Sequence, residues 1–283
     1  MTPFNDEFLF ITEQNPYRLD YMQNGEFKAP ALTRKNADFI EAVVGLDSNY
    51  AKDNIVTKVP SDGYNPEINA TKSNGMYCGS SAYWFNEMQK PGADFSYCLL
   101  GAIIAVDITN STHLEASDNG RKVMREIICS KCSNVDDLKK RINIPFKADN
   151  KEHLISLMCR RTATKKKNSD RYNLSFATKF CSYAAKYLKC NIEYPKYDNV
   201  VSDALPDYMN IYLKEITNKR YYKINDYEQR QFKDDEIKMR DYRLNIYQRY
   251  NDDILKIVSN LKAHNINITI EEFDHIIWYG FKG

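Results

Sequence analysis

The sequence predicts a mostly α-helical fold, and three observations support this prediction. From Asp94 onward, apolar residues recur at helical spacing, helix-capping residues precede several of these segments, and the alternation typical of strands is scarce. The chain has 283 residues, of which 43% are hydrophobic, so it can bury a sizeable core and is not wholly disordered. We expect an irregular N-terminal extension of helix and loop over residues 1–93, followed by one helical domain over residues 94–283.

The extension is predicted from turn-prone clusters. VPSDGYNPE and KSNGMYCGSS separate short apolar pieces such as FLFI and FIEAVVGL. The domain begins with FSYCLLGAIIAVDI, which is apolar nearly all round and should therefore form a central helix of the core. Next come three shorter predicted helices: GRKVMREIIC, VDDLKKRI capped by Asn134, and KEHLISLMCRR capped by Asn150.

The second half of the domain continues the helical pattern. NLSFATKFCSYAAKYL carries one apolar stripe, formed by Leu174, Ala177, Phe180, Cys181 and Ala184. Asp198 opens NVVSDAL, and Pro206 is expected to begin a separate helix, because proline suits the first helical position. Thr269 and Glu272 have the spacing of a capping box at the start of the last helix. The apolar residues of that helix should dock it on the core: Phe273, Ile276, Ile277 and Trp278.

Composition narrows the class of protein. No apolar run reaches the roughly 18 residues that a membrane-spanning helix needs, so we expect no membrane partner. The N-terminus MTPFNDEFLF carries acids where a secretory signal carries Lys or Arg. Seven cysteines at irregular spacing suggest reduced thiols. We therefore expect a cytoplasmic protein, and we expect it to be a monomer.

Basic residues cluster between residues 160 and 171, where RRTATKKKNSDR holds six basic residues and one acid. One interpretation is a solvated loop. The other is a contact with nucleic-acid phosphates, because clustered Lys and Arg gain affinity by releasing counterions from a polyanion. The candidate DNA-binding residues of this cluster are Arg160, Arg161, Lys165, Lys166, Lys167 and Arg171.

A lysine and an aspartate follow the basic cluster. Lys179 is expected in the first turn of a helix with apolar neighbours, and Asp198 follows behind a proline turn at an expected helix N-cap. The helix dipole and desolvation should both lower the pKa of Lys179, which favours the nucleophilic free amine. A carboxylate at a helix N-terminus should stay ionised, and it could then stabilise a developing positive charge or move a proton.

This arrangement resembles the helix-hairpin-helix DNA glycosylase superfamily, most closely its 8-oxoguanine glycosylase branch. There, a hairpin of the type Leu-Pro-Gly-Val-Gly-x-Lys leads into the helix of the catalytic lysine, and an aspartate follows about nineteen residues later. In this chain the lysine falls on Lys179 and the aspartate on Asp198, with Thr178 before the lysine. The two hairpin glycines fall on Ser175 and Ala177, and Pro195 stands one position further from the aspartate than the family usually has it.

The resemblance implies an enzyme of the hydrolase class that binds double-stranded DNA, flips out a modified base and excises it, with a lyase activity where a Schiff base forms. Lys179 would attack C1′ and form a Schiff base, and Asp198 would stabilise the charge that develops at C1′. Ser175, Ala177 and Thr178 would contact DNA, as would the basic cluster. The base would be an oxidised purine, as in repair, or a hypermodified base of phage DNA such as glucosylated hydroxymethylcytosine, as in antiviral defence.

Aromatic residues usually line the base pocket of such enzymes. The candidates in this chain are Phe176, Tyr183, Tyr197, Tyr208 and Trp278, for each of which ordinary core packing is the competing interpretation. CSKC (Cys129 and Cys132) has the spacing of metal ligands but lacks a second pair, so we expect neither a metal nor a cofactor. Two other functions remain open. One is a nucleic-acid-binding protein that keeps this scaffold without its chemistry, and the other is a protein-interaction module.

Overall fold

The computed structural model is mostly α-helical, as the sequence predicts. It describes residues 4, 22–23, 26–27, 30–38, 81–110, 112, 114, 120–162, 171–217, 221–224, 231–232 and 235–281. The chain divides into two compact units. Unit 1 comprises Met1–Lys52, Tyr197–Arg230 and Ile246–Gly283, and unit 2 comprises Asp53–Lys196 and Gln231–Asn245. This division does not coincide with a boundary after residue 93, and most of residues 1–80 lie outside the described part, so the extension stays a prediction.

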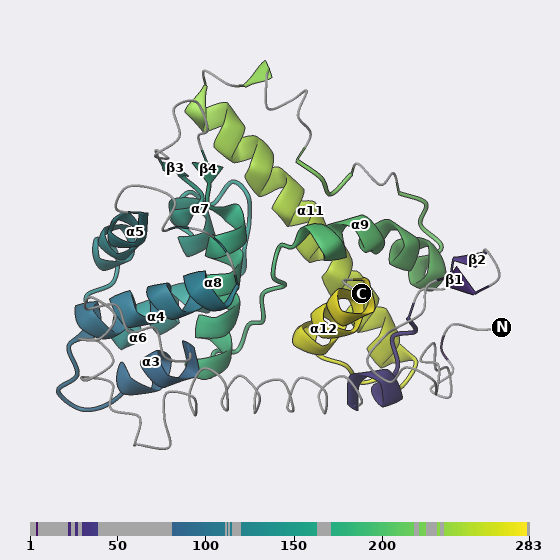
Figure 1. Cartoon of the computed structure of the whole chain (residues 1–283), viewed down its shortest axis with the longest axis horizontal. Coiled ribbons are helices and arrows are strands. Elements are labelled where there is room, and N and C mark those ends of the chain that lie inside the picture. The colour runs from purple at the N-terminus through teal and green to yellow at the C-terminus, as the bar shows by residue number, and fades with distance from the viewer. Residues whose placement is uncertain are drawn as a thin grey trace. The chain divides into compact units, whose positions relative to one another are not determined.

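Unit 2 is built around the helices α4 and α8 (Figure 1). Its described helices are α3 (Ser81–Glu87), α4 (Phe95–Thr109), α5 (Gly120–Cys129), α6 (Val135–Ile142), α7 (Leu154–Met158) and α8 (Leu174–Tyr187). As its apolar surface predicts, α4 is central: it packs against α3, α5 and α8. Its N-cap is Asp94, whose carboxylate accepts a hydrogen bond from the Tyr97 amide at 3.0 Å.

A short β-ribbon connects α7 to α8. Strand β3 (Arg161–Thr162) pairs antiparallel with β4 (Arg171–Tyr172), so the two strands enclose the middle of the basic cluster. α7 and α8 pack against each other on either side of this connection. The segment joining the two helices is therefore longer than the tight hairpin that the resemblance implies.

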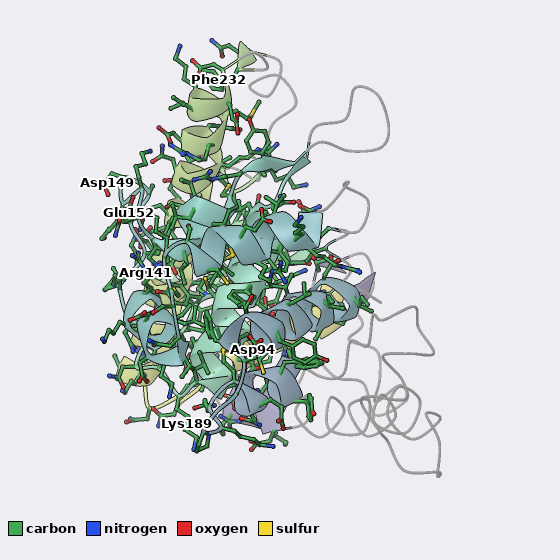
Figure 2. All side chains as sticks on the ribbon, turned by 90° about the vertical axis from the view of Figure 1, so that its left-hand side faces the viewer. Asp94, Arg141, Asp149, Glu152, Lys189 and Phe232 are labelled. Atoms are coloured by element: carbon green, nitrogen blue, oxygen red, sulfur yellow. The ribbon has the colours of Figure 1, made fainter. Side chains whose placement is uncertain are left out.

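Charged side chains lie on the outside of unit 2. Figure 2 shows Arg141, Asp149 and Glu152 along one side of it. The Arg141 guanidinium donates to the carbonyl oxygens of Lys131 at 3.0 Å and Glu152 at 3.2 Å. The Lys131 ammonium in turn pairs with the Glu152 carboxylate at 2.7 Å, so these residues tie the end of α6 to the loop before α7.

Unit 1 contains α9 (Asn199–Tyr208), the π-helix η3 (Met209–Leu213), the later part of α11 (Glu236–Ala263) and α12 (Ile270–Phe281). Strands β1 (Met22–Gln23) and β2 (Glu26–Phe27) form a two-residue antiparallel pair. α12 packs against α9 (Figure 1). The prediction that the last helix docks on the core is confirmed, because Phe273, Ile276 and Ile277 are buried.

Several predicted caps are confirmed. Asn134 caps α6 by accepting from the Asp137 amide at 3.0 Å, and Asp198 caps α9. The capping box also forms: Thr269 accepts from the Glu272 amide at 3.1 Å, and Glu272 accepts from the Thr269 amide at 2.7 Å.

Two predicted helix starts are wrong. The Asn150 side chain accepts from the Glu152 amide in a turn of its own, and α7 begins only after His153. Pro206 lies inside α9 instead of opening a new helix. Its missing N–H removes one helical bond, but Leu205 and Tyr208 are buried beside it, and their packing holds the helix together until it widens into η3.

Close packing of α3 on α4 leads to a stability prediction. A Cβ atom added at Gly101 would overlap the indole ring of Trp84, which is buried and packs edge-on against Tyr83 and Tyr97. Gly101→Ala should therefore destabilise the protein by about 1–3 kcal/mol. The measurement is the midpoint of urea unfolding followed by tryptophan fluorescence, which should be lower than in wild type. The control is Gly92→Ala, which has nothing within 4 Å and a φ of +77°, and should cost about 1 kcal/mol through backbone strain alone. A Gly101→Ala midpoint equal to wild type would contradict the packing.

Candidate functional site

Lys179 is a buried lysine on α8, with 8% of its surface exposed. It lies between Thr178 and Phe180, which are fully buried. Its Nζ atom is 3.5 Å from the carbonyl oxygen of Asn110, the residue that ends α4. The sequence predicts Lys179 in the first turn of its helix. This prediction is wrong, because α8 begins at Leu174 and Lys179 therefore lies in the second turn. The dipole at the start of α8 therefore acts on the amine less than expected, since that effect fades after the first turn.

Asn110 also bonds to Tyr183, and Tyr183 in turn contacts Lys196. Tyr183 follows Lys179 by one helical turn, and its hydroxyl donates to Oδ1 of Asn110 at 3.2 Å. The Lys196 ammonium lies 4.6 Å from the centre of the Tyr183 ring, in the geometry of a cation–π contact. Lys196 is itself only 7% exposed. Lys196 thus contacts Tyr183 directly, whereas Lys179 and Tyr183 both bond to Asn110.

Asp198 is the N-cap of α9 in unit 1. Its backbone is extended, and its Oδ1 atom accepts a hydrogen bond from the Val200 amide at 2.8 Å. The neighbouring Tyr197 is buried and packs edge-on against Tyr250, with ring centres 5.3 Å apart. Burial raises the pKa of Tyr250 well above its ordinary value, and the charges of Asp274 and Asp198 raise it further, so this phenol stays protonated.

The candidate catalytic pair is divided between the two units, with Lys179 in unit 2 and Asp198 in unit 1. The helix that presents each residue is as the sequence predicts: Lys179 is near the start of α8, and Asp198 caps the next helix along the chain, α9.

The candidate DNA-binding residues fall into three groups. Arg160 is exposed at the start of the ribbon, and Ser175 is half-buried in the first turn of α8. Ala177 and Thr178 are fully buried, and the Ala177 amide donates to the Asn173 carbonyl at 2.9 Å, so neither side chain is at the surface to contact DNA. Arg161 lies in β3 and Arg171 in β4, but the structure does not describe their side chains. Lys165, Lys166 and Lys167 lie outside the described residues.

The candidate base-pocket aromatics are mostly core residues. Phe176 and Tyr208 are buried, and the Tyr208 hydroxyl donates to the Pro30 carbonyl at 2.7 Å. Tyr197 donates to the Tyr222 carbonyl at 2.7 Å. These contacts match the competing interpretation of ordinary packing. Tyr183 and Trp278 are half-buried, and Tyr183 contacts Asn110 through its hydroxyl and Lys196 through its ring.

Sequence reasoning missed Asn110 and Lys196. The four-residue spacing of Lys179 and Tyr183 on one helix was visible, and it identifies the face of α8 that carries the amine. Nothing in the sequence shows that the end of α4 and the segment before Asp198 reach the same face, because those contacts span 69 and 13 residues.

The six described cysteines are free thiols. Burial raises the pKa of Cys132 to about 11 and that of Cys159 to about 12, so both thiols stay protonated at neutral pH. Within the described residues, no three His, Cys, Asp or Glu side chains come together in an arrangement that could hold a metal ion.

His153 gives the protein a pH-dependent stability. Its Nδ1 atom accepts from the Ile155 amide at 3.1 Å, and its Nε2 atom is 3.1 Å from the Ile144 carbonyl oxygen. Burial lowers the pKa of His153 to about 4. The unfolded state binds the proton below about pH 6.5 and the folded state only below about pH 4, so stability is lost as the pH falls through this window. At pH 5 the expected loss relative to pH 7 is about 2 kcal/mol.

Urea unfolding at pH 7 and pH 5 measures this loss. His153→Asn is the matched variant, because asparagine also caps helices but does not titrate. The variant should lose less stability than wild type between the two pH values. Identical losses in both proteins would show that His153 is not the group responsible.

No family model, no curated protein and no solved structure matches this chain. Among the described residues, no helix is both long enough and apolar enough to cross a bilayer.

Proposed function

We propose that this chain is a DNA glycosylase that excises a modified base, with Lys179 as nucleophile and Asp198 as the supporting carboxylate. One observation carries the proposal: Lys179 is buried to 8% exposure on an apolar helix, while a carboxylate caps the next helix nineteen residues later. Burying an ammonium is costly, so a lysine in such a place is a candidate for chemistry that needs a desolvated amine.

Each group has a defined part in the reaction. Asp198 stabilises the positive charge that develops at C1′ while the bond to the base breaks, and the base leaves with the bonding electron pair and takes up a proton. The neutral amine of Lys179 forms a bond to C1′. Loss of the amine proton and opening of the C1′–O4′ bond then give a Schiff base, from which strand cleavage could follow.

Two features support duplex DNA as the partner. Strand β3 begins within the first residues of the basic cluster, and β4, which holds its last residue, leads directly into α8. The Asn173 side chain, at the N-cap position of α8, donates to the Arg160 carbonyl at 3.2 Å and makes no cap to the helix, so the first amides of α8 are not covered by it. Helix N-termini and clustered basic side chains both favour phosphate.

We further propose that the enzyme works as a monomer in the cytoplasm. The free thiols of the six described cysteines support a reducing compartment. The excised base is either an oxidised purine or a hypermodified base of invading phage DNA, and the missing hairpin glycines favour the second.

A second candidate is a DNA-binding protein without catalysis. The Lys179 ammonium lies at the C-terminal end of α4, where the Asn110 carbonyl and the helix dipole stabilise a positive charge. In this case the role of Lys179 is structural, because its ammonium stabilises the C-terminal end of α4. The protein then binds DNA with strong salt dependence but releases no base.

The experiment that separates the two candidates measures abasic sites. The protein is incubated with a duplex containing 8-oxoguanine and, separately, with phage DNA containing glucosylated hydroxymethylcytosine. The glycosylase proposal predicts abasic sites in one of them. Salt-dependent binding to both DNAs without abasic sites in either would favour the binding protein.

A further inference from the structure

Asn110, at the end of α4, bonds to two side chains of α8. Its backbone carbonyl oxygen is 3.5 Å from the Nζ atom of Lys179, and its Oδ1 atom accepts a hydrogen bond from the Tyr183 hydroxyl at 3.2 Å. Lys179 and Tyr183 are one helical turn apart and therefore lie on one face of α8. A single residue of α4 thus engages two successive turns of this face.

Asn110 is also held by α4 itself. Its Nδ2 atom donates to the Val106 carbonyl at 3.0 Å, and its backbone amide donates to the same carbonyl at 3.2 Å. The side-chain amide of Asn110 therefore uses its N–H group on α4 and its oxygen on α8. The Tyr183 hydroxyl supplies the α8 side of this arrangement, so it helps to fix the residue whose carbonyl faces Lys179.

A buried carboxylate holds the chain that follows Asn110. The Asp107 side chain has no exposed surface, and it lies on α4 shortly before Asn110. It accepts hydrogen bonds of 2.6–2.8 Å from the Thr112 hydroxyl, the Leu114 amide and the Arg121 guanidinium. Because disturbing a buried, hydrogen-bonded charge is costly, the backbone on both sides of Asn110 is firmly placed.

We propose that Asn110 is a positioning residue for the Lys179 amine, and that Tyr183 acts through Asn110 by holding its side chain. This role rests on the proposed function, in which Lys179 is the nucleophile. A neutral amine that donates one N–H bond to a fixed carbonyl oxygen has a restricted lone-pair direction. Attack on C1′ depends on that direction, because a misplacement of about 1 Å can cost about 10²-fold in rate.

The first test measures the reactivity of Lys179 in the full chain, without DNA. Formaldehyde and cyanoborohydride methylate lysine amines, and mass spectrometry of the α8 peptide gives the rate at Lys179. Tyr183→Phe removes the hydroxyl and keeps the ring, so the Asn110 side chain loses its bond to α8. We expect Lys179 to be methylated about three- to tenfold faster in this variant, which corresponds to the loss of one hydrogen bond.

Tyr187→Phe is the matched control. It removes a phenol hydroxyl one turn further along α8 and leaves the bonds of Asn110 to Lys179 and Tyr183 in place, so the Lys179 rate should equal that of wild type. Lys196 is the internal reference, because it is buried and contacts the Tyr183 ring, which phenylalanine retains. An unchanged Lys179 rate in Tyr183→Phe, or an equal acceleration at Lys196, would overturn the proposal.

The second test compares Tyr183→Phe, Asn110→Ala and the double variant in borohydride trapping on DNA. The maximal single-turnover rate should fall about three- to tenfold in Tyr183→Phe, while the half-saturating DNA concentration stays unchanged. Because Tyr183 acts through Asn110, the double variant should be no slower than Asn110→Ala alone, and losses that multiply would contradict this dependence. Circular dichroism confirms that each variant folds, and Asn110→Ser replaces Asn110→Ala if the latter does not.

The two tests fail separately. Methylation needs no DNA and no catalysis, so it reports the placement of the Lys179 amine whatever the reaction. Faster methylation of Lys179 in Tyr183→Phe, together with no trapping by the wild-type protein, would confirm that Asn110 and Tyr183 place the amine and would refute only the proposed function.

Discussion

Asp198→Asn should abolish most base release, with a fall of about 10²–10⁴-fold in the single-turnover rate. The substitution removes the negative charge that would stabilise the developing cation at C1′. It should leave the fold intact, because Asp198 caps α9 through the Val200 amide and asparagine is an equally good N-cap. The measurement is the rate of abasic-site formation on whichever modified DNA the wild-type protein processes.

Asp203→Asn is the matched control for this prediction. Asp203 lies on the same helix, is exposed and pairs with Lys223. An exposed ion pair contributes little, so this variant should keep the wild-type rate. If both variants were equally slow, the effect would belong to the charge of α9 in general and not to Asp198.

Lys179→Met should eliminate covalent trapping altogether. Borohydride reduces a Schiff base to a stable amine, so a protein that attacks C1′ through Lys179 becomes linked to DNA in its presence. Methionine keeps the apolar stem of the side chain on α8 and removes the amine, so the core around Phe176 and Phe180 should be retained. The measurement is the yield of the cross-linked band on a denaturing gel.

Lys186→Met is the control, since it removes an exposed lysine from the same helix. It should trap as well as wild type. A cross-link that persists in Lys179→Met at wild-type yield would assign the nucleophile to a different amine.

The sequence is informative where the structure depends on local chemistry. The apolar surface of residues 95–108 predicts a central helix, and the caps at Asn134, Asp198 and Thr269 follow from side chains that bond to amides within three residues. Pro206 shows the limit of this reasoning. Its ring favours a helix start, but burial of the residues around it keeps α9 continuous.

The candidate site shows the same limit. Lys179 and Asp198 were recognisable because their spacing along the chain carries the resemblance. Asn110 and Lys196 were not, because their contacts with α8 are tertiary and leave no periodicity in the sequence. The middle of the basic cluster, Lys165 to Lys167, lies outside the described residues, so its part in DNA binding stays a prediction.

The most direct test of the central claim is to identify the residue that becomes linked to DNA. The protein is trapped with borohydride on DNA that carries an abasic site or a substrate base, the complex is digested, and the modified peptide is sequenced by mass spectrometry. We expect the deoxyribose remnant on Lys179 in the α8 peptide. A remnant on another lysine, or no adduct from any of these DNAs, would contradict Lys179 as the nucleophile.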